Sequence, residues 1–223
     1  MSFDRLAPWY RWMENLLAGG KLHCGRTAFL DQIPPPERIL LPGEGHGRTL
    51  IECCRRFPTA QITCVDASAG MIAQARRQLA RHHLSDARVQ FIHANLLFWS
   101  PPAQTYDLII TNYFLDCFCP DQLARLIPRL AANATPEASW LLADFQIPPA
   151  GLARLRSRLI LWSLYVFFRL TTRLPAHQLT PPDTVLLAAG FTRHQRVETE
   201  WGLLHSDWWR RSSIERQIIP FPI

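Results

Sequence analysis

The stretch "ILLPGEGHGRTL", residues 39–50, places three glycines within five positions directly after an apolar run. Glycine adopts backbone conformations that other residues avoid, and it lets another group approach the backbone closely. A helix that follows such a loop presents unpaired backbone N–H groups at its first turn. We therefore expect residues 43–47 to contact a ligand at the start of a helix.

The segments around this loop alternate between strands and helices. Strand–helix–strand units at this spacing give right-handed crossovers and a parallel sheet that is covered by helices on both faces. The last two strands are close enough in sequence to form an antiparallel hairpin. We predict a three-layer α/β fold with a mostly parallel seven-stranded sheet, and expect Pro128 to kink or shorten its helix. The predicted strands are 37–41, 61–65, 88–94, 106–112, 139–145, 191–199 and 201–209, and the predicted helices are 48–57, 68–83, 121–132, 151–174 and a short one that opens at Pro182.

The composition is that of a globular chain, with 48% hydrophobic and 19% charged residues and a net charge of +6. The cationic residues are scattered, which favours a solvated basic surface over an anionic membrane or an RNA partner. The first residues do not form the apolar core of a signal peptide. The apolar run 159–168 is too short for a helix of about 20 residues that spans a membrane. We expect a cytoplasmic protein with at most surface contact to a membrane, and no metal site, because the six cysteines lack zinc-ligand spacing.

The spacing of the glycines separates two classes of nucleotide ligand. A dinucleotide fingerprint, G-x-G-x-x-G, needs its third small residue at position 48, which is Arg48. Glu44 is unfavourable beside a pyrophosphate and favourable beside a ligand that carries an ammonium group and a sulfonium. Asp66 ends the second predicted strand, where its carboxylate can accept hydrogen bonds from a ribose or cap the helix that starts near Ser68.

Four stretches resemble the successive motifs of class I S-adenosylmethionine-dependent methyltransferases. They are "ILLPGEGHGRTL", "CVDASAGMIAQARRQL", "VQFIHANLLFW" and "YDLIITNYFLDCF", which fall within residues 36–146. Both ends of the chain loosely resemble the small-molecule methyltransferases of ubiquinone and menaquinone biosynthesis. The N-terminal likeness rests on Phe3, Leu6, Ala7 and Tyr10, but Arg11 stands where that family has an aspartate. The resemblance implies a Rossmann-like methyltransferase fold and S-adenosyl-L-methionine as the cofactor.

The resemblance also implies a set of cofactor-binding residues. The glycine loop would hold the methionine end of the cofactor, Asp66 the ribose, and Met71 and Asn95 the adenine. Each of these residues also has a structural interpretation as a turn, cap or core residue. The full set is Gly43, Glu44, Gly45, His46, Gly47, Asp66, Ala67, Met71, Asn95, Leu96 and Asn112.

Three residues are candidates for catalytic roles. Asp116 follows the fourth strand, where a carboxylate beside an apolar pocket can act as a general base or start a helix. His205 lies among tryptophans near the terminal strand pair, and Tyr10 lies in the N-terminal segment. Either residue could instead have a structural role.

These observations favour a methyltransferase that acts on a small, largely apolar or aromatic molecule by in-line methyl transfer. The "(D/N)-P-P-(Y/F)" loop of many nucleic-acid methyltransferases is absent from "TNYF" at 111–114, so no nucleic-acid partner is expected. Three alternatives stay open: a nicotinamide-dependent oxidoreductase, an RNA or protein methyltransferase, and a non-catalytic protein that binds the cofactor to stabilise a partner.

The chain is predicted to form one domain. Its predicted parts are an N-terminal helical cap (1–33), a cofactor-binding core (36–146), a helical lid or substrate region (150–180) and a C-terminal helix with a strand pair (181–223). The apolar helix in 150–174 would pack in the core, cover a lipophilic substrate or rest on a membrane with its arginines toward the headgroups.

Overall fold

The computed structural model describes residues 20–100, 103–172, 176 and 178–211, and within them it contains one sheet of seven strands. The strand order is β3-β2-β1-β4-β5-β7-β6. Strands β1 to β5 are parallel, and β7 pairs antiparallel with both β5 and β6. The predicted sheet is confirmed. The strands are β1 (Arg38–Pro42), β2 (Gln61–Asp66), β3 (Val89–His93), β4 (Tyr106–Asn112), β5 (Ala134–Phe145), β6 (Phe191–Thr199) and β7 (Leu204–Arg211).

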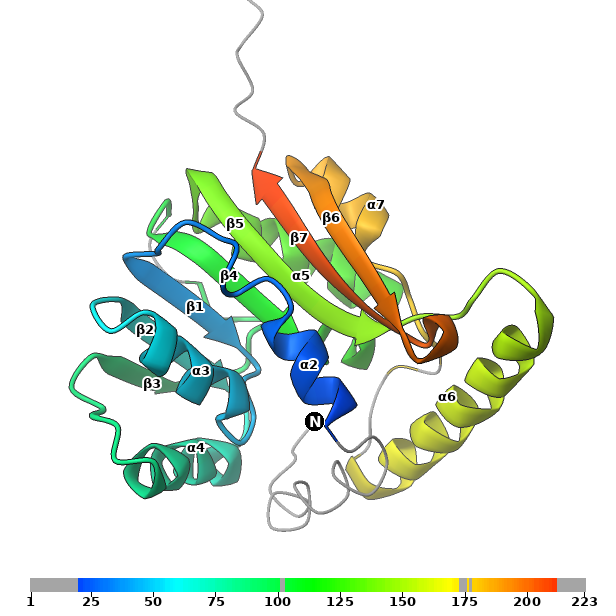
Figure 1. The fold of residues 1–223 in the computed structure, drawn as a ribbon, viewed down its shortest axis with the longest axis horizontal. Helices are drawn as coiled ribbons and strands as arrows, with labels where there is room; N and C mark the ends of the chain where they lie inside the picture. The colour runs from blue at the N-terminus through cyan, green and yellow to red at the C-terminus, as the bar shows by residue number, and fades with distance from the viewer. Residues whose placement is uncertain (1–19, 101–102, 173–175, 177, 212–223) are drawn as a thin grey trace, which may run out of the picture.

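Helices cover both faces of the sheet, which confirms the three-layer fold (Figure 1). Helices α2, α3 and α4 lie on one face, α5 and α7 lie on the other, and α6 lies beyond the end of β5. None of these described helices is both long enough and apolar enough to cross a membrane. The helices are α2 (Lys21–Thr27), α3 (Arg48–Arg56), α4 (Ala69–Arg81), α5 (Pro120–Ala132), α6 (Gly151–Thr172) and α7 (Asp183–Ala188), with short 3₁₀ turns at Leu115–Cys117 and Glu200–Gly202.

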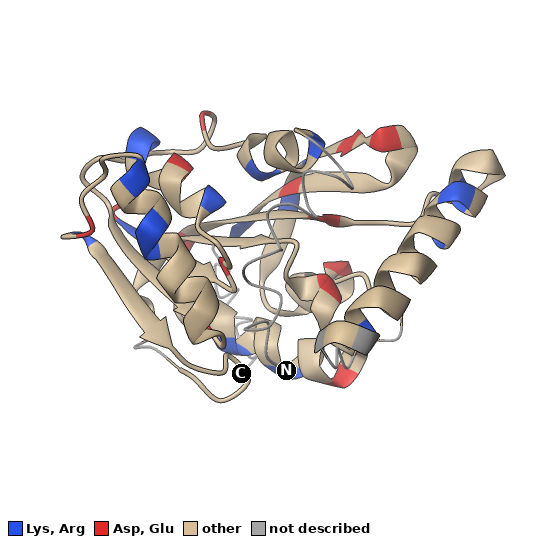
Figure 2. Cartoon of the chain, turned by 90° about the horizontal axis from the view of Figure 1, so that it is seen from below, with Lys and Arg blue, Asp and Glu red and all other residues tan. Residues whose placement is uncertain are grey.

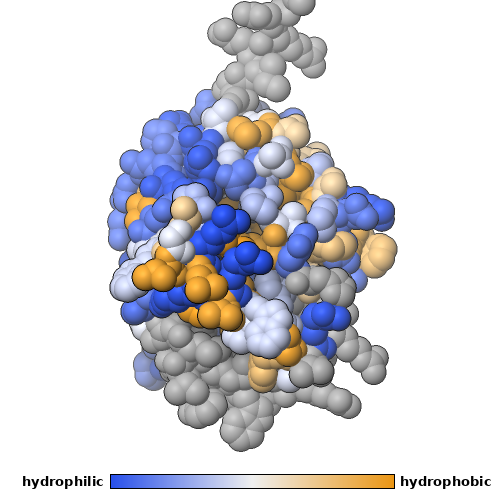
Figure 3. Space-filling view, turned by 90° about the vertical axis from the view of Figure 1, so that its right-hand side faces the viewer, coloured by the Kyte–Doolittle hydropathy of each residue, from blue (hydrophilic) through white to orange (hydrophobic). Residues whose placement is uncertain are grey.

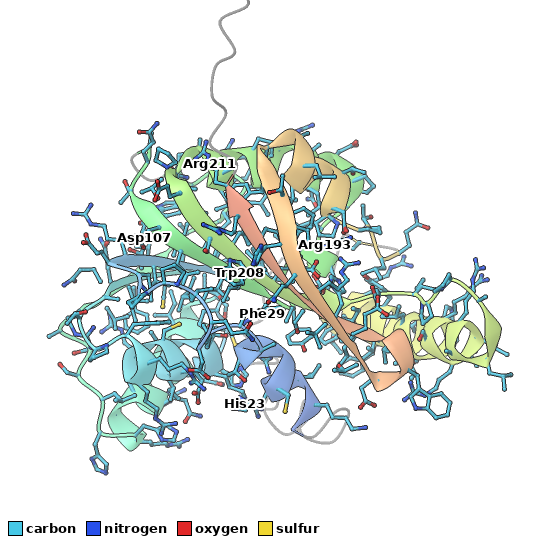
Figure 4. The ribbon with its side chains drawn as sticks, turned by 45° about the horizontal axis from the view of Figure 1, so that its top comes forward. His23, Phe29, Asp107, Arg193, Trp208 and Arg211 are labelled. Carbon is cyan, nitrogen blue, oxygen red and sulfur yellow. The ribbon has the colours of Figure 1, made fainter. Side chains whose placement is uncertain are left out.

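Each face of the sheet has its own apolar core. On the face of α5 and α7, Trp140 of β5 packs with Phe191 of β6, whose ring centroid is 5.3 Å away. On the face of α2, α3 and α4, Phe29 packs against Trp208 of β7 at 6.4 Å, as Figure 4 shows. Strand β1 lies at the centre, with four of its five residues buried, as expected for a parallel strand covered on both faces.

The strand order changes direction between β1 and β4, which are neighbours in the sheet although β2 and β3 separate them in sequence. Ligands of open α/β sheets bind at the carboxyl ends of the strands beside such a reversal. Asp107 fixes the opposite ends of these two strands, because its carboxylate accepts the backbone N–H groups of Glu37 and Arg38 at 2.7 and 3.0 Å. The loops after β1, β2, β4 and β5 therefore form the candidate site.

Three expectations about the elements differ from the structure. Pro128 does not shorten helix α5, which ends at the predicted Ala132, because its buried face holds it against the sheet at the cost of one backbone hydrogen bond. The last strand begins at Leu204 instead of 201, since Glu200 and Trp201 form a tight turn with φ of 56° and 61°. Strand β5 also begins five residues before the predicted start, at Ala134.

Candidate functional site

The three glycines between β1 and α3 all have positive φ, but their surroundings differ. A Cβ on Gly43 would lie 2.1 Å from the ring of Phe114, and one on Gly47 would lie 2.9 Å from the Cα of Ala75 in α4. A Cβ on Gly45 would meet no atom within 4 Å. Gly43 and Gly47 are therefore needed for packing, whereas Gly45 borders the open space that a ligand could occupy.

Asp66 connects this loop to the start of α4. Its carboxylate accepts the backbone N–H of Gly45 at 3.0 Å and the backbone N–H of Ser68 at 2.8 Å. The Ser68 hydroxyl in turn caps α4 by accepting the N–H of Met71 at 3.1 Å. These two bonds hold the glycine loop to the start of α4. The predicted contact of Asp66 with a ribose stays a prediction.

Glu44 turns toward the first turn of α3. One carboxylate oxygen accepts the N–H of Leu50 at 3.0 Å. Burial raises the pKa of the Glu44 carboxyl to about 7, although the Leu50 hydrogen bond and the nearby Arg26 guanidinium act in the opposite direction. The structure thus gives Glu44 a capping role at the helix that follows the glycine loop. Its predicted contact with the cofactor stays a prediction.

The residues predicted for the adenine side surround the ends of β2 and β3. Met71 is buried at the start of α4, Leu96 is buried in the core beside α5, and Ala67 is exposed. Asn95 is exposed after β3, and its side-chain oxygen accepts the N–H of Leu97 at 3.0 Å. Asn95 is thus held in a turn on the same edge of the sheet as Asp66.

Asn112 and His46 form contacts within the protein. Asn112 accepts the N–H of Ala143 at 3.0 Å and donates to the Thr49 hydroxyl at 3.3 Å, which joins the end of β4 to β5 and α3. His46 is buried, and its Nε2 accepts the Nε–H of Arg48 at 2.9 Å. This bond requires an unprotonated Nε2. The assigned cofactor contacts of both residues stay predictions.

A pair of acidic residues lies at the carboxyl ends of β4 and β5. The backbone N–H of Asp116 donates to the carboxylate of Asp144 at 3.2 Å, and Asp144 also accepts the N–H of Phe145 at 2.8 Å. Burial raises the pKa of Asp116 to about 6. Burial and repulsion from Asp116 raise the pKa of Asp144 well above its usual range. Both carboxyls therefore hold a proton more tightly than carboxyls in water.

The α6 helix packs over this acidic pair. The Tyr165 hydroxyl donates to the backbone carbonyl of Asp116 at 3.1 Å. Leu161 and Tyr165 are buried with Leu22, Leu203 and Leu204, so the surroundings of the acidic pair are apolar. The Cys117 thiol donates to the Asp116 carboxylate at 3.5 Å, and burial raises the pKa of that thiol well above its usual range. Cys117 is therefore a thiol and not a nucleophilic thiolate.

His205 lies on the other side of Asp144, its pairing partner between β5 and β7. Its Nδ1 is 3.3 Å from the carboxylate of Asp207, which Arg196 binds through two bonds of 2.6 and 2.7 Å. Burial alone would raise the pKa of Asp207, but the hydrogen bonds from Arg196 and His205 lower it below its usual value. The residues His205, Arg196, Asp183, Phe145, Gln146, Ile147, Leu179 and Pro181 line a cavity of about 230 Å³.

The structure therefore brings together two of the three predicted catalytic residues. Asp116 and His205 flank Asp144, whereas Tyr10 lies outside the described residues. Sequence reasoning missed Asp144, although it ends the apolar strand "SWLLADF" much as Asp66 ends the second strand. It also missed Asp207, for which the sequence holds no local signal. Among the described residues no cluster of three potential metal ligands occurs, and none of the six cysteines is in a disulfide.

Comparisons with known proteins match the part of the chain that contains the glycine loop, Asp66 and Asp116. The profile of a family described as "Methyltransferase domain" matches residues 39–137. A trans-aconitate 2-methyltransferase from Rhodopseudomonas palustris (strain BisB18) is 40% identical over 85 residues, 37% of this chain and 30% of that enzyme. A malonyl-(acyl-carrier protein) O-methyltransferase from Priestia megaterium is 36% identical over 107 residues, 48% of this chain and 36% of that enzyme. The chain thus aligns with less than half the length of either relative.

Solved structures agree on the fold. The mitomycin 7-O-methyltransferase MmcR superposes with a TM-score of 0.68 at 17% identity, over 95% of this chain and 61% of that one. The likeness therefore extends beyond the residues that the family profile matches. The profile and the two relatives are methyltransferases, each matched over less than half of this chain, and the solved structure shares its fold.

Proposed function

We propose that the protein transfers a methyl group from S-adenosylmethionine to a small, largely apolar or aromatic acceptor by in-line displacement. The observation that carries this proposal is the hydrogen bond between Asp66 and Gly45 near the switch point of the sheet. A second feature, the acidic pair of Asp116 and Asp144, lies at the same edge. The first feature suits a nucleoside, and the second suits an acceptor that must lose a proton.

The residues at the carboxyl ends of β1 and β2 fit the cofactor. Gly45 leaves open space where a side chain would obstruct a ligand. Asp66 places a carboxylate, a hydrogen-bond acceptor suited to ribose hydroxyls, at the end of β2, and Asn95 lies after β3 on the same edge of the sheet. When bound, S-adenosylmethionine supplies a methyl group on a positively charged sulfur. The domain's own task is to bind, to orient the acceptor and to exclude water.

Asp116 is the proposed proton acceptor. It is only partly buried, whereas Asp144 behind it is 2% exposed, so Asp116 is the member of the pair that an acceptor can reach. Its raised pKa of about 6 makes it a stronger base than an ordinary carboxylate and leaves it ionised near neutral pH. The proton of a hydroxyl or amine acceptor would pass to the Asp116 carboxylate, and Asp144 would position that carboxylate through the Asp116 backbone.

The apolar cluster beneath α6 supports an apolar acceptor. Tyr113 and Phe145 pack together with their ring centroids 5.6 Å apart, and both border the buried Leu161 and Tyr165 of α6. Aromatic side chains at the ends of β4 and β5 offer flat apolar surfaces to a ring-shaped acceptor. A lipophilic acceptor would also suit a protein that contacts a membrane surface.

Mass spectrometry tests the proposed reaction. The full chain is incubated with S-adenosylmethionine and a panel of phenols, aromatic amines and carboxylic acids, and formation of S-adenosylhomocysteine is measured. We expect turnover with an aromatic or apolar acceptor, and a fall of about 10² or more in Asp116→Asn. Asp121→Asn, at an exposed acid in the first turn of α5, is the matched control. Tight cofactor binding without turnover on any acceptor would favour a non-catalytic binding protein. Activity only on RNA or protein would favour a polymer methyltransferase.

A nicotinamide-dependent oxidoreductase is not supported. The family profile and both curated relatives are methyltransferases, and Arg48 occupies the third small position of the dinucleotide fingerprint.

A further inference from the structure

Helix α6 exposes a continuous line of apolar side chains to solvent. These residues are spaced three or four apart, so they share one face of the helix. They are between 37% and 81% exposed, which is unusual for five large apolar side chains in register. We call them the α6 stripe: Leu152, Leu155, Leu159, Trp162 and Val166.

The stripe is distinct from the face by which α6 packs on the protein. Ser157, Leu161 and Tyr165 are buried and define that face. With 3.6 residues per turn, the stripe lies on the opposite side of the helix. Figure 3 views this side of the molecule and shows orange apolar atoms beside blue polar ones. The apolar residues of the stripe are therefore not used to hold α6 in place.

Arginines border the stripe. Helix α6 contains four arginines, at positions 154, 156, 158 and 169, and no acidic residue (Figure 2). The helical geometry places Arg158 and Arg169 along one border of the stripe and Arg156 along the other. The Arg156 guanidinium lies 5.7 Å from the ring centroid of Trp201, an indole that is 74% exposed on the turn between β6 and β7.

We propose that the α6 stripe docks the protein on an anionic lipid surface. Apolar side chains can enter the boundary between headgroups and acyl chains, while arginine stems extend outward and place their charges among lipid phosphates. Trp162 and Trp201 suit the headgroup region, where tryptophan is enriched. The net charge of +6 adds to the attraction.

The charge pattern favours lipid over a second copy of the chain. A two-fold interface brings the same surface of both copies together. Two α6 stripes would then bring Arg158 and Arg169 near the same arginines of the other copy, with no acidic residue on either helix to neutralise them, whereas Arg156 lies 4.0 Å from the Glu200 carboxylate. An anionic membrane supplies the missing negative charge. This docking is independent of the proposed methyl transfer.

Vesicle sedimentation of the full chain tests the proposal without measuring turnover. The vesicles contain phosphatidylcholine alone, or phosphatidylcholine with about a third replaced by phosphatidylserine. We expect binding to the anionic vesicles to exceed binding to the neutral ones by about ten-fold or more and to fall with added salt. Equal binding to both vesicles, or binding to neither, would overturn the proposal.

Two sets of variants assign the binding to α6. Leu155→Ser, Leu159→Ser and Trp162→Ser together should abolish vesicle binding, whereas the matched triple Phe98→Ser, Leu187→Ser and Val197→Ser, at exposed apolar residues elsewhere, should retain it. Arg158→Gln with Arg169→Gln should weaken binding by about ten-fold, whereas Arg77→Gln with Arg81→Gln in α4 should not.

If the triple serine variant fails to fold, vesicle binding by the Arg158→Gln, Arg169→Gln double variant still tests the proposal. Equal losses in the variants and their controls would contradict the proposal. A second result would also contradict the proposal. In it, light scattering detects a dimer of the parent protein that dissociates in the stripe variant, while vesicle binding is unchanged.

Discussion

The backbone N–H of Asp116 donates to the carboxylate of Asp144 at 3.2 Å, and this bond joins the turn after β4 to the end of β5. The carbonyl of Asp116 accepts the hydroxyl of Tyr165, so the same residue also anchors α6. The acidic pair is thus both a candidate catalytic feature and a junction of three elements. Its titration should affect stability as well as turnover.

The pH dependence of stability reports the raised pKa of Asp116. Its pKa is about 6 in the folded protein against an ordinary value of 3.8, because burial disfavours the charged form. The favourable contribution of the protonated carboxyl is complete below pH 3.8 and is lost as the pH rises through about 6. Asp116→Asn should therefore gain stability over the parent protein between these pH values, by up to about 3 kcal/mol at pH 7.

Urea denaturation at pH 4, 6 and 8 measures this difference. Asp121→Asn serves as the control, because Asp121 is exposed at the start of α5. A stability difference between Asp116→Asn and the parent that does not change with pH would show that Asp116 titrates normally.

The pH dependence of turnover should follow the same group. If the Asp116 carboxylate accepts the acceptor's proton, kcat/KM rises with pH and levels off above about 6, since the ionised form is the base. The measurement is kcat/KM from pH 5 to 8 with any acceptor found by mass spectrometry. A profile that lacks this rise, or one that Asp116→Asn leaves unchanged, would assign the base to another residue.

Two substitutions in the glycine loop should separate its role in packing from its role in ligand access. Gly43→Ala should destabilise the fold by about 2 kcal/mol or more, because its Cβ would overlap the Phe114 ring. Gly45→Ala meets no neighbouring atom and should cost only about 1 kcal/mol from its positive φ. It should nevertheless weaken cofactor binding.

Thermal unfolding and calorimetry of the two variants, each compared with the parent, check this prediction. Equal losses of stability in both variants would be inconsistent with an open space at Gly45.

The buried ion pair of Asp207 and Arg196 should be important for stability. Asp207 is fully buried, and its carboxylate is bound at both oxygens by Arg196. Asp207→Ala leaves the guanidinium without this partner and should cost about 3 kcal/mol. Urea denaturation measures the loss, with Asp86→Ala, at an exposed pair with Arg76, as the control. Similar, small effects of both substitutions would argue against the ion pair.

Much of the fold could be predicted from the sequence because its signals are local. The glycine loop, the apolar strands and the Ser68 cap predict β1 to β4 to within about two residues. The start of β7 was not predictable in this way. Glu200 and Trp201 adopt positive φ although neither is glycine, so the turn depends on tertiary contacts and not on local propensity.

The candidate site was predictable only where residues follow strand ends. Asp66 ends β2 and Asp116 lies in the turn after β4, so both lie at the predicted edge of the sheet. Asp207 lies within β7 and becomes part of the site region only because Arg196 of β6 pairs beside it. Such a contact between distant segments has no counterpart in the spacing of the sequence.

The most direct test of the account is calorimetric titration of the parent protein and Asp66→Ala with S-adenosylmethionine. We predict one binding site in the parent and a Kd raised by about ten- to a hundred-fold in Asp66→Ala, because a charged hydrogen-bond acceptor is removed. NADH should produce no binding heat. Equal affinities in the two proteins, or binding of NADH in place of S-adenosylmethionine, would contradict a methyl-donor site at the ends of β1 and β2.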